Sequence, residues 1–127
     1  MTAETLVSKV LIIDDDPFIS EMYLLKFKDE HFDVAIAHSG KEGLRKISEF
    51  DPDVILLDIV MPDMDGFQML EELKNQGGRS RKIIMLTNLG QKEDVERGMA
   101  LGVRDYMVKA HFTPSEVAER VKKLSAS

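Results

Sequence analysis

The chain has 127 residues, 43% of them hydrophobic and 31% charged, with a formal net charge of −6, which fits one globular domain with a full core. The acidic balance argues against a nucleic-acid-binding surface on this domain, because binding to phosphates needs a basic face. The absence of cysteine excludes disulfides and thiol chemistry and fits a reducing cytoplasm, and we expect neither a secretion signal nor a membrane span.

Short apolar runs alternate with helical patterns along the chain. The first run, residues 10–13, is typical of a buried strand, and it ends in Asp14-Asp15-Asp16. Pro17, preceded by Asp16 as N-cap, predicts that a first helix begins there. The apolar face expected for this helix consists of Ile19, Met22, Tyr23, Leu24, Leu25 and Phe27.

The middle of the chain repeats this alternation. A second strand is predicted at residues 32–37, and Ser39 with Glu42 forms a capping-box pattern that begins a second helix. The apolar run 54–57 predicts a third strand, buried on both faces of a sheet. A third helix follows at about residues 67–75.

The last part of the chain adds two more strand–helix pairs. Strands are predicted at residues 83–86 and 103–108, with a weakly amphipathic helix at about 91–100 between them. That helix carries few large apolar residues, so we expect it to be the loosest one. Thr113 and Glu116 form a second capping-box pattern, which begins the final helix.

Five strands that alternate with five helices predict an α/β fold. Short βα connections imply a parallel sheet, covered by helices on both faces through right-handed crossovers. In a parallel sheet all the carboxyl ends of the strands lie at one edge, where open α/β sheets place their chemistry. The polar residues predicted to meet at this edge are Asp14, Asp15, Asp58, Thr87 and Lys109.

Three carboxylates in one pocket need compensation. Two carboxylates ~4 Å apart repel by about 4 kcal/mol at an effective dielectric of ~20, so a raised pKa or a bound cation is required. Mg²⁺ is suited to this role, since it joins carboxylates to a phosphate. Lysine and threonine side chains opposite would contact phosphoryl oxygens, and a carboxylate can itself be the nucleophile. The sequence therefore predicts Mg²⁺-assisted phosphoryl transfer onto an aspartate, without a Gly-rich nucleotide loop.

In these residues the chain resembles the receiver domain of two-component response regulators, including chemotaxis-type single receivers. The resemblance covers about residues 7–124 and implies one receiver domain over residues 1–127, with a doubly wound, flavodoxin-like sheet in the strand order 2-1-3-4-5. The matching residues are Asp14-Asp15, Asp58, Met61-Pro62, Asp65-Gly66, Thr87 and Lys109.

The resemblance assigns roles to the acidic residues. Asp58 would be the phosphoacceptor, and Mg²⁺ would be held by Asp14, Asp15, Asp58 and the backbone carbonyl of Val60. Asp15 would be a direct ligand, whereas Asp14 would act mainly through water. Three adjacent acids leave the register open, but the end of the apolar run favours Asp14 and Asp15 as the pair, with Asp16 as the helix cap.

The resemblance also implies a switch. Lys109 would contact the phosphoryl group, and Thr87 would move toward that group on activation. Tyr106 matches the aromatic position that swings inward when Thr87 moves. Read without the resemblance, Tyr106 is an ordinary half-buried strand aromatic.

The partners follow from the same resemblance. It implies a cytoplasmic histidine kinase or phosphotransfer protein as the phosphodonor, with transfer catalysed largely by the receiver itself. It further implies an output surface on the fourth helix, fifth strand and fifth helix, through which a homodimer could form. Arg104, Asp105 and Arg120 could make ion pairs between subunits there.

Two residues depart from the family pattern. Ala110 follows Lys109, where the family usually has a proline in a cis peptide. Either this chain contains a non-proline cis bond, which costs ~2.5–4 kcal/mol, or the loop runs differently. Asn88 follows Thr87, where a small residue is common, so its bulk could change access to the pocket.

Two other classes of protein are weighed against a receiver. In a haloacid-dehalogenase-type phosphatase, Asp14 would be the nucleophile and Asp16 the acid/base, but such enzymes need a further acidic pair after the lysine. Only Glu116 and Glu119 follow, on a predicted helix. A phosphorylation-independent interaction module is the other alternative, and the presence of all five active-site residues argues against it.

Overall fold

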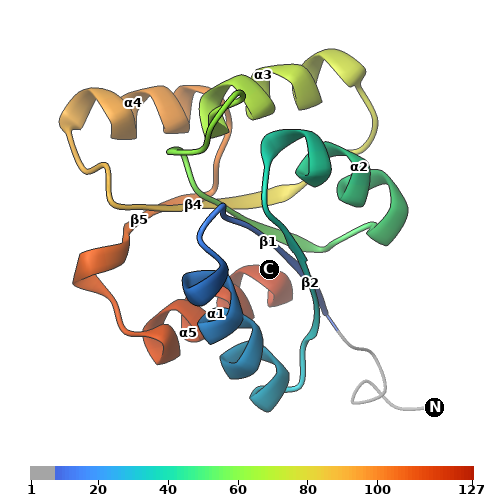
Figure 1. Ribbon diagram of the computed structural model, residues 1–127, viewed down its shortest axis with the longest axis vertical. Coiled ribbons are helices and arrows are strands. Elements are labelled where there is room, and N and C mark those ends of the chain that lie inside the picture. The colour runs from blue at the N-terminus through green and yellow to red at the C-terminus, as the bar shows by residue number, and fades with distance from the viewer. Residues whose placement is uncertain (1–7) are drawn as a thin grey trace.

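A computed structural model describes residues 8–127 of the chain (Figure 1). The predicted core began at about Val7, which lies outside these residues. The strands are β1 (Lys9–Ile13), β2 (Asp33–Ala37), β3 (Val54–Leu57), β4 (Lys82–Thr87) and β5 (Asp105–Val108). The helices are α1 (Pro17–Asp29), α2 (Gly40–Phe50), α3 (Gly66–Gln76), α4 (Lys92–Ala100), α5 (Pro114–Ala126) and a 3₁₀ turn, η2 (Lys109–His111).

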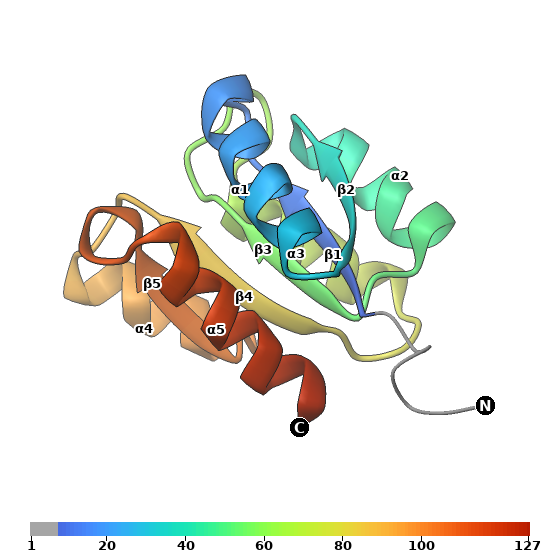
Figure 2. The ribbon, with the colours of Figure 1, turned by 90° about the horizontal axis from the view of Figure 1, so that it is seen from below.

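The strands form one parallel sheet in the order β2-β1-β3-β4-β5. Helices α1 and α5 cover one face, and α2, α3 and α4 cover the other (Figures 1 and 2). The central strand β3 is buried along its whole length, because helices lie over both of its faces. The predicted fold class and strand order are confirmed.

Each face of the sheet has its own hydrophobic core. Because successive strand residues point to opposite faces, Leu11 and Ile13 belong to the core under α2 and α3, whereas Val10 and Ile12 belong to the core under α1 and α5. Fully burying a side chain of this size contributes roughly 1.5–3 kcal/mol. The two cores hold the strand ends, and hence the polar edge, in fixed positions.

Polar caps fix where the helices begin. The Asp16 side chain accepts hydrogen bonds from the amides of Phe18 (2.9 Å) and Ile19 (3.3 Å), which confirms it as the N-cap of α1. The predicted Thr113–Glu116 capping box of α5 is confirmed as well. Each such cap contributes about 1 kcal/mol.

Two caps differ from the prediction. Ser39 accepts from the Glu42 amide at 3.1 Å, but the Glu42 carboxylate accepts from the amide of His38, one residue before the cap. The predicted reciprocal box of α2 is therefore wrong in its second half. Conversely, Asp65 and Gln68 form a reciprocal box at the start of α3, which was not predicted.

The apolar face of α1 is narrower than expected. Tyr23 and Phe27 are buried, whereas Leu25 is 60% exposed and Met22 is 41% exposed. Apolar residues lie nearly all around this helix, so spacing alone did not identify the side that faces the sheet. The expectation that Leu25 widens the buried face is wrong.

The last strand and the loop after it also differ from the prediction. Strand β5 begins at Asp105 rather than residue 103, although Val103 is buried in the core under α2 and α3. None of the described peptide bonds is cis, so the bond between Lys109 and Ala110 is trans and the chain continues into the turn η2. The loop thus runs differently, which answers the question left open by the sequence. No helix in residues 8–127 is long and apolar enough to cross a membrane.

Candidate functional site

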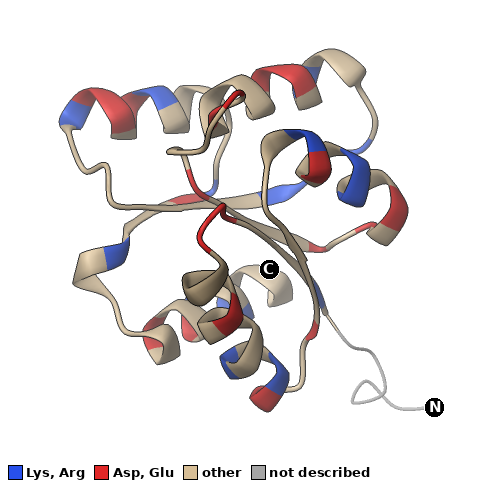
Figure 3. Ribbon diagram, in the orientation of Figure 1, with Lys and Arg blue, Asp and Glu red and all other residues tan. Residues whose placement is uncertain are grey.

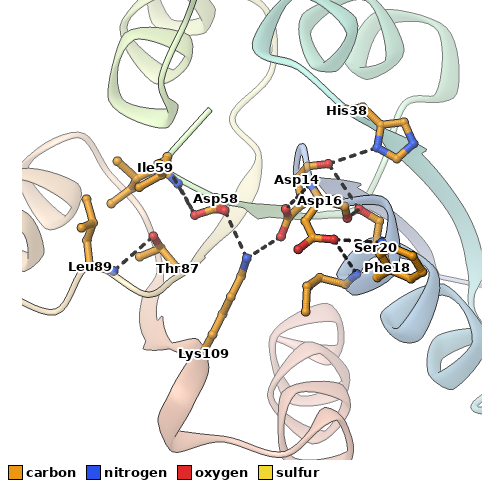
Figure 4. A network of polar contacts seen from close by, with 12 residues as sticks. Asp14, Asp16, Phe18, Ser20, His38, Asp58, Ile59, Thr87, Leu89 and Lys109 are labelled. Carbon is orange, nitrogen blue, oxygen red and sulfur yellow. Dashed lines mark hydrogen bonds and ion pairs between the residues drawn. The ribbon is translucent and has the colours of Figure 1, made fainter. Parts of the chain in front are cut away.

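The polar residues predicted at the strand ends come together at one edge of the sheet. Asp14 follows β1, Asp58 follows β3, Thr87 ends β4 and Lys109 follows β5. Acidic segments lie where β1 and β3 end, and a basic segment follows β5 (Figure 3). Figure 4 shows the side chains of Asp14, Asp58 and Lys109 meeting, with Thr87 on the neighbouring strand.

Lys109 lies between two buried carboxylates. Its Nζ donates to Asp14 Oδ2 at 2.5 Å and to Asp58 Oδ2 at 3.1 Å (Figure 4). Asp14 is 3% exposed and Asp58 is 7% exposed. In such surroundings an ion pair is weakly screened, and the single ammonium compensates the repulsion between the two carboxylates.

The pKa values of Asp14 and Lys109 reflect both burial and the charges of neighbouring groups. Burial raises the pKa of Asp14, and the hydrogen bond from Lys109 opposes this shift. Burial alone would lower the pKa of Lys109, but its hydrogen bond to Asp14 and the charge of Asp58 outweigh that effect and raise the pKa. Lys109 is therefore held as a cation.

The carboxylate of Asp58 is fixed through one oxygen and open through the other. Oδ1 accepts from the amide of Ile59 at 2.7 Å and from that of Val60 at 3.4 Å. Oδ2 faces Lys109. One oxygen is thus held by the backbone, while the second points toward the pocket.

Gly66 is required close to Asp58. A Cβ placed on Gly66 would lie 2.4 Å from the carbonyl oxygen of Asp58. The amide of Gly66 also donates to the carbonyl of Ile59 at 2.9 Å. Only a glycine permits this approach, so Gly66 sets the course of the loop after β3.

Hydrogen bonds also fix the side chain and the carbonyl group of Asp14. Its Oδ1 accepts from the amide of Asp16 at 2.9 Å. Its carbonyl accepts from Ser20 Oγ at 3.2 Å and lies 3.2 Å from Nδ1 of His38. Ser20 is fully buried, and no sequence pattern indicated either side chain, because both contact the backbone of Asp14 rather than a side chain.

An acidic cluster can hold a divalent cation. Carboxylate oxygens of Asp14, Asp15 and Asp58 lie within 4.8 Å of one another. Asp16, the alternative in the register question, uses its carboxylate to cap α1. Several hard oxygen ligands at such distances suit a divalent cation of the Mg²⁺ type.

The cluster opens into a cavity of about 560 Å³. Asn88 and Ala110, the two departures from the family pattern, both line this cavity. The other residues lining it are Asp14, Asp15, Asp16, Ile19, Met22, Tyr23, Asp58, Val60, Lys109, Phe112 and Pro114. The charged residues are therefore accessible to a small ligand from outside.

Thr87 connects to Tyr106 through one intervening residue. Thr87 is fully buried, and its Oγ1 accepts from the amide of Leu89 at 3.4 Å. The carbonyl of Leu89 accepts from the hydroxyl of Tyr106 at 2.5 Å. Burial raises the pKa of Tyr106 to about 12, so this hydroxyl keeps its proton. The sequence did not indicate the part played by the Leu89 backbone.

The Tyr106 ring packs against a glycine. The ring is partly buried and borders the core under α2 and α3. A Cβ at Gly98 of α4 would lie 3.2 Å from the ring, so the absence of a side chain there leaves room for the tyrosine. The Tyr106 ring therefore lies inward, against α4.

A five-stranded parallel sheet with this acidic pocket and a lysine at its carboxyl edge defines the class of receiver domains. The family model for the response regulator receiver domain matches residues 10–122. The chain belongs to this family. It is a receiver domain of the two-component type, whose general function is phosphorylation-dependent signalling.

Individual relatives agree with this assignment. The DNA-binding response regulator MtrA of Mycolicibacterium smegmatis is 34% identical over 94% of this chain and 51% of its own length. The alkaline phosphatase synthesis transcriptional regulatory protein PhoP of Bacillus subtilis is 36% identical over 90% of this chain and 47% of its own length. The chain spans about half the length of these curated relatives.

Solved structures show the same fold. The receiver domain of the Francisella response regulator 1452 superimposes with a TM-score of 0.86 at 34% identity, covering 94% of this chain and 97% of that one. The chemotaxis protein CheY4 of Vibrio cholerae gives a TM-score of 0.86 at 30% identity, covering 94% of this chain and 99% of that one.

Proposed function

We propose that this receiver accepts a phosphoryl group on Asp58 from a histidine kinase or a phosphotransfer protein. The observation that carries this proposal is the asymmetry of the Asp58 carboxylate. Backbone amides fix Oδ1, while Oδ2 faces the cavity 3.1 Å from the Lys109 ammonium. This is the arrangement expected of a carboxylate nucleophile opposite a charge that stabilises the transferring group.

The reaction transfers one phosphoryl group between two nucleophiles. A carboxylate oxygen of Asp58 forms a bond to phosphorus, while the bond between phosphorus and the donor imidazole nitrogen breaks. The imidazole leaves with the electron pair of that bond and takes up a proton. Lys109 compensates the charge on the phosphoryl oxygens, and the product is an acyl phosphate. Attack by water on phosphorus reverses the modification and returns Asp58 and inorganic phosphate.

The acidic cluster fits a resident Mg²⁺. The carboxylates of Asp14, Asp15 and Asp58 would hold it together with the backbone carbonyl of Val60, and the ion would supply positive charge to the carboxylates and to the phosphoryl group. Within the described residues, Lys109 is the cation that lies between Asp14 and Asp58. The protein itself therefore contributes only part of the positive charge that three carboxylates require.

We further propose that phosphorylation is transmitted along the path from Thr87 to Tyr106. Movement of Thr87 toward the phosphoryl group would release the amide of Leu89, whose carbonyl holds the Tyr106 hydroxyl. The resemblance implies an inward swing of Tyr106 on activation, but the ring already packs against α4 without a phosphoryl group. The loop before α4 and the Tyr106 ring would therefore change position together from this starting point. The surface of α4, β5 and α5 would carry the output and a homodimer contact.

One expectation about that surface needs revision. Arg120 pairs with Asp105 within the chain. These two charges are therefore already partnered in a single copy, and the proposed homodimer would have to rearrange them or use other residues such as Arg104. We propose residues 1–127 as one receiver domain that works in the cytoplasm, without nucleic-acid or membrane binding by this domain.

The proposal is tested by phosphorylation with acetyl phosphate, read by intact mass. We expect one added phosphoryl group in the wild type with Mg²⁺, and none in Asp58→Asn or without Mg²⁺. Asp63→Asn is the matched control, because Asp63 is exposed and has a positive φ of 69° that asparagine tolerates.

Other outcomes would assign another function. Label that survives in Asp58→Asn but disappears in Asp14→Asn would indicate a phosphatase with Asp14 as the nucleophile. Folded wild type that binds Mg²⁺ and takes no label would indicate an interaction module that works without phosphorylation.

A further inference from the structure

Tyr23 occupies a position between the core and the phosphorylation pocket. It lies on α1 and is 3% exposed, and its ring packs against Phe27 with centroids 6.1 Å apart. The same residue lines the cavity that contains Asp14, Asp58 and Lys109. The sequence indicated a core aromatic here, which accounts for the ring but not for the hydroxyl.

The Tyr23 hydroxyl has no hydrogen-bond partner among the described residues. No fully buried side-chain oxygen in this part of the chain lacks a partner, so the hydroxyl is not sealed inside the core. It therefore opens into the cavity that Tyr23 lines. Tyr23 and Asn88 are the neutral polar side chains of that cavity lining.

The pKa of Tyr23 responds to burial and to two charged residues of the cavity. Burial raises the pKa of Tyr23, the positive charge of Lys109 lowers it and the negative charge of Asp14 raises it again. Because the net pKa is above the ordinary value, the phenol is neutral at physiological pH and its oxygen can accept a hydrogen bond.

Lys109 has one donor left for such a contact. An ammonium carries three N–H donors, and within residues 8–127 those of Lys109 reach one oxygen of Asp14 and one of Asp58. The third donor has no acceptor among these residues, and Lys109 lines the same cavity as Tyr23. A neutral acceptor that faces the same cavity satisfies this donor without adding a further negative charge.

We propose that Tyr23 is a positioning residue for Lys109, and that its hydroxyl oxygen accepts the third N–H of the Lys109 ammonium through one bridging water. This contact would hold the ammonium against Asp58, where the charge of the incoming phosphoryl group develops. The catalytic part of the inference rests on the proposed function of Asp58.

The test compares Tyr23→Phe with the wild type in two measurements. The first is the NMR signal of the Lys109 side-chain Cε and its protons, assigned by its absence in Lys109→Arg. The phenylalanine ring keeps the packing against Phe27, so loss of the oxygen should move the Lys109 signal more than that of any other lysine. Phe27→Leu is the packing control, which should lower the melting temperature but leave the Lys109 signal in place.

The second measurement is the rate of phosphorylation by acetyl phosphate. We expect the maximal rate of Tyr23→Phe to fall about two- to tenfold, as the loss of one hydrogen bond in the reacting state predicts. The acetyl phosphate concentration at half-maximal rate should stay the same. A role in packing alone would not separate these two quantities.

An unchanged Lys109 signal in Tyr23→Phe would overturn the inference. So would a maximal rate of phosphorylation in Tyr23→Phe equal to that of a wild type that is phosphorylated. If Tyr23→Phe binds Mg²⁺ more weakly but leaves the Lys109 signal unchanged, the hydroxyl contacts Asp14 instead of Lys109. That result would also overturn the inference. Failure of the proposed function has another signature, the absence of label on wild-type Asp58. The NMR comparison needs no phosphoryl transfer and still decides whether Tyr23 positions Lys109.

Discussion

The Lys109 ammonium lies 2.5 Å from Oδ2 of Asp14, although the two residues are 95 positions apart in the sequence. They follow β5 and β1, which are not neighbours in the sheet, since β3 and β4 lie between them. The contact therefore spans the pocket across Asp58, and it joins the first strand of the fold to the last. A long-range pair of this kind connects the stability of the domain to the chemistry of its pocket.

Lys109→Met should destabilise the protein by roughly 2–4 kcal/mol at pH 7 without divalent cations, because it leaves two buried carboxylates without their ammonium. Urea unfolding in the presence of a chelator measures this change. Lys41→Met, on an exposed position of α2, is the control and should stay within about 0.5 kcal/mol of the wild type. Equal stability of both variants would mean that Lys109 does not compensate the carboxylates.

The pH dependence of stability can be tested at Asp51, far from the pocket. Hydrogen bonds from Arg81 and Arg79 lower the pKa of Asp51 below its ordinary value of 3.8. A lowered pKa in the folded state means that the pair stabilises the protein above pH ~3.8 and that this contribution is lost as the pH falls through the folded pKa.

Asp51→Asn should therefore lower the melting temperature at pH 7 by a small, salt-sensitive amount, because the pair is on the surface. The difference from the wild type should disappear in acid, below the folded pKa. Asparagine suits the test, since Asp51 has a positive φ of 53° that it tolerates. A difference that persists unchanged in acid would assign the effect to the backbone rather than to the ion pair.

The sequence predicted those parts of the site that have a periodic or positional signal. Buried apolar runs located the strands, and a polar residue after each run located Asp14, Asp58 and Lys109 at the edge of the sheet. Caps such as Asp16 and Thr113 have short, local patterns and were found for the same reason.

Contacts to backbone atoms have no such signal. Ser20 reaches the carbonyl of Asp14, and the peptide groups of Leu89 join Thr87 to Tyr106, but backbone atoms are the same in every residue. The exposure of Leu25 was missed because a helix that is apolar nearly all around does not reveal its buried side. A role for the hydroxyl of Tyr23 was not predicted, because the apolar ring alone accounted for a tyrosine on the buried face of the helix.

Gly66→Ala tests the loop that supports Asp58. The new Cβ would lie 2.4 Å from the carbonyl oxygen of Asp58, so the backbone there must move. We expect a loss of roughly 2–4 kcal/mol in stability and at least ~10-fold slower phosphorylation, since small displacements of reacting groups reduce rates strongly. Gly78→Asn is the control: its φ of +93° strains any side chain, but open space surrounds it, so this variant should lose some stability and leave the rate unchanged. Normal phosphorylation of Gly66→Ala would show that the loop adjusts without displacing Asp58.

The adjacent acids Asp15 and Asp16 offer a matched pair for the Mg²⁺ site. The Asp15 carboxylate belongs to the cluster with Asp14 and Asp58, whereas that of Asp16 accepts amide hydrogen bonds at the start of α1. Asp15→Asn should weaken Mg²⁺ binding at least about tenfold, because a charged oxygen ligand is lost. Asp16→Asn should leave binding within about twofold and the melting temperature unchanged, since asparagine caps helices as well as aspartate does. Calorimetric titration with Mg²⁺ measures both variants, and weaker binding in Asp16→Asn alone would move the metal-binding pair one residue along the chain.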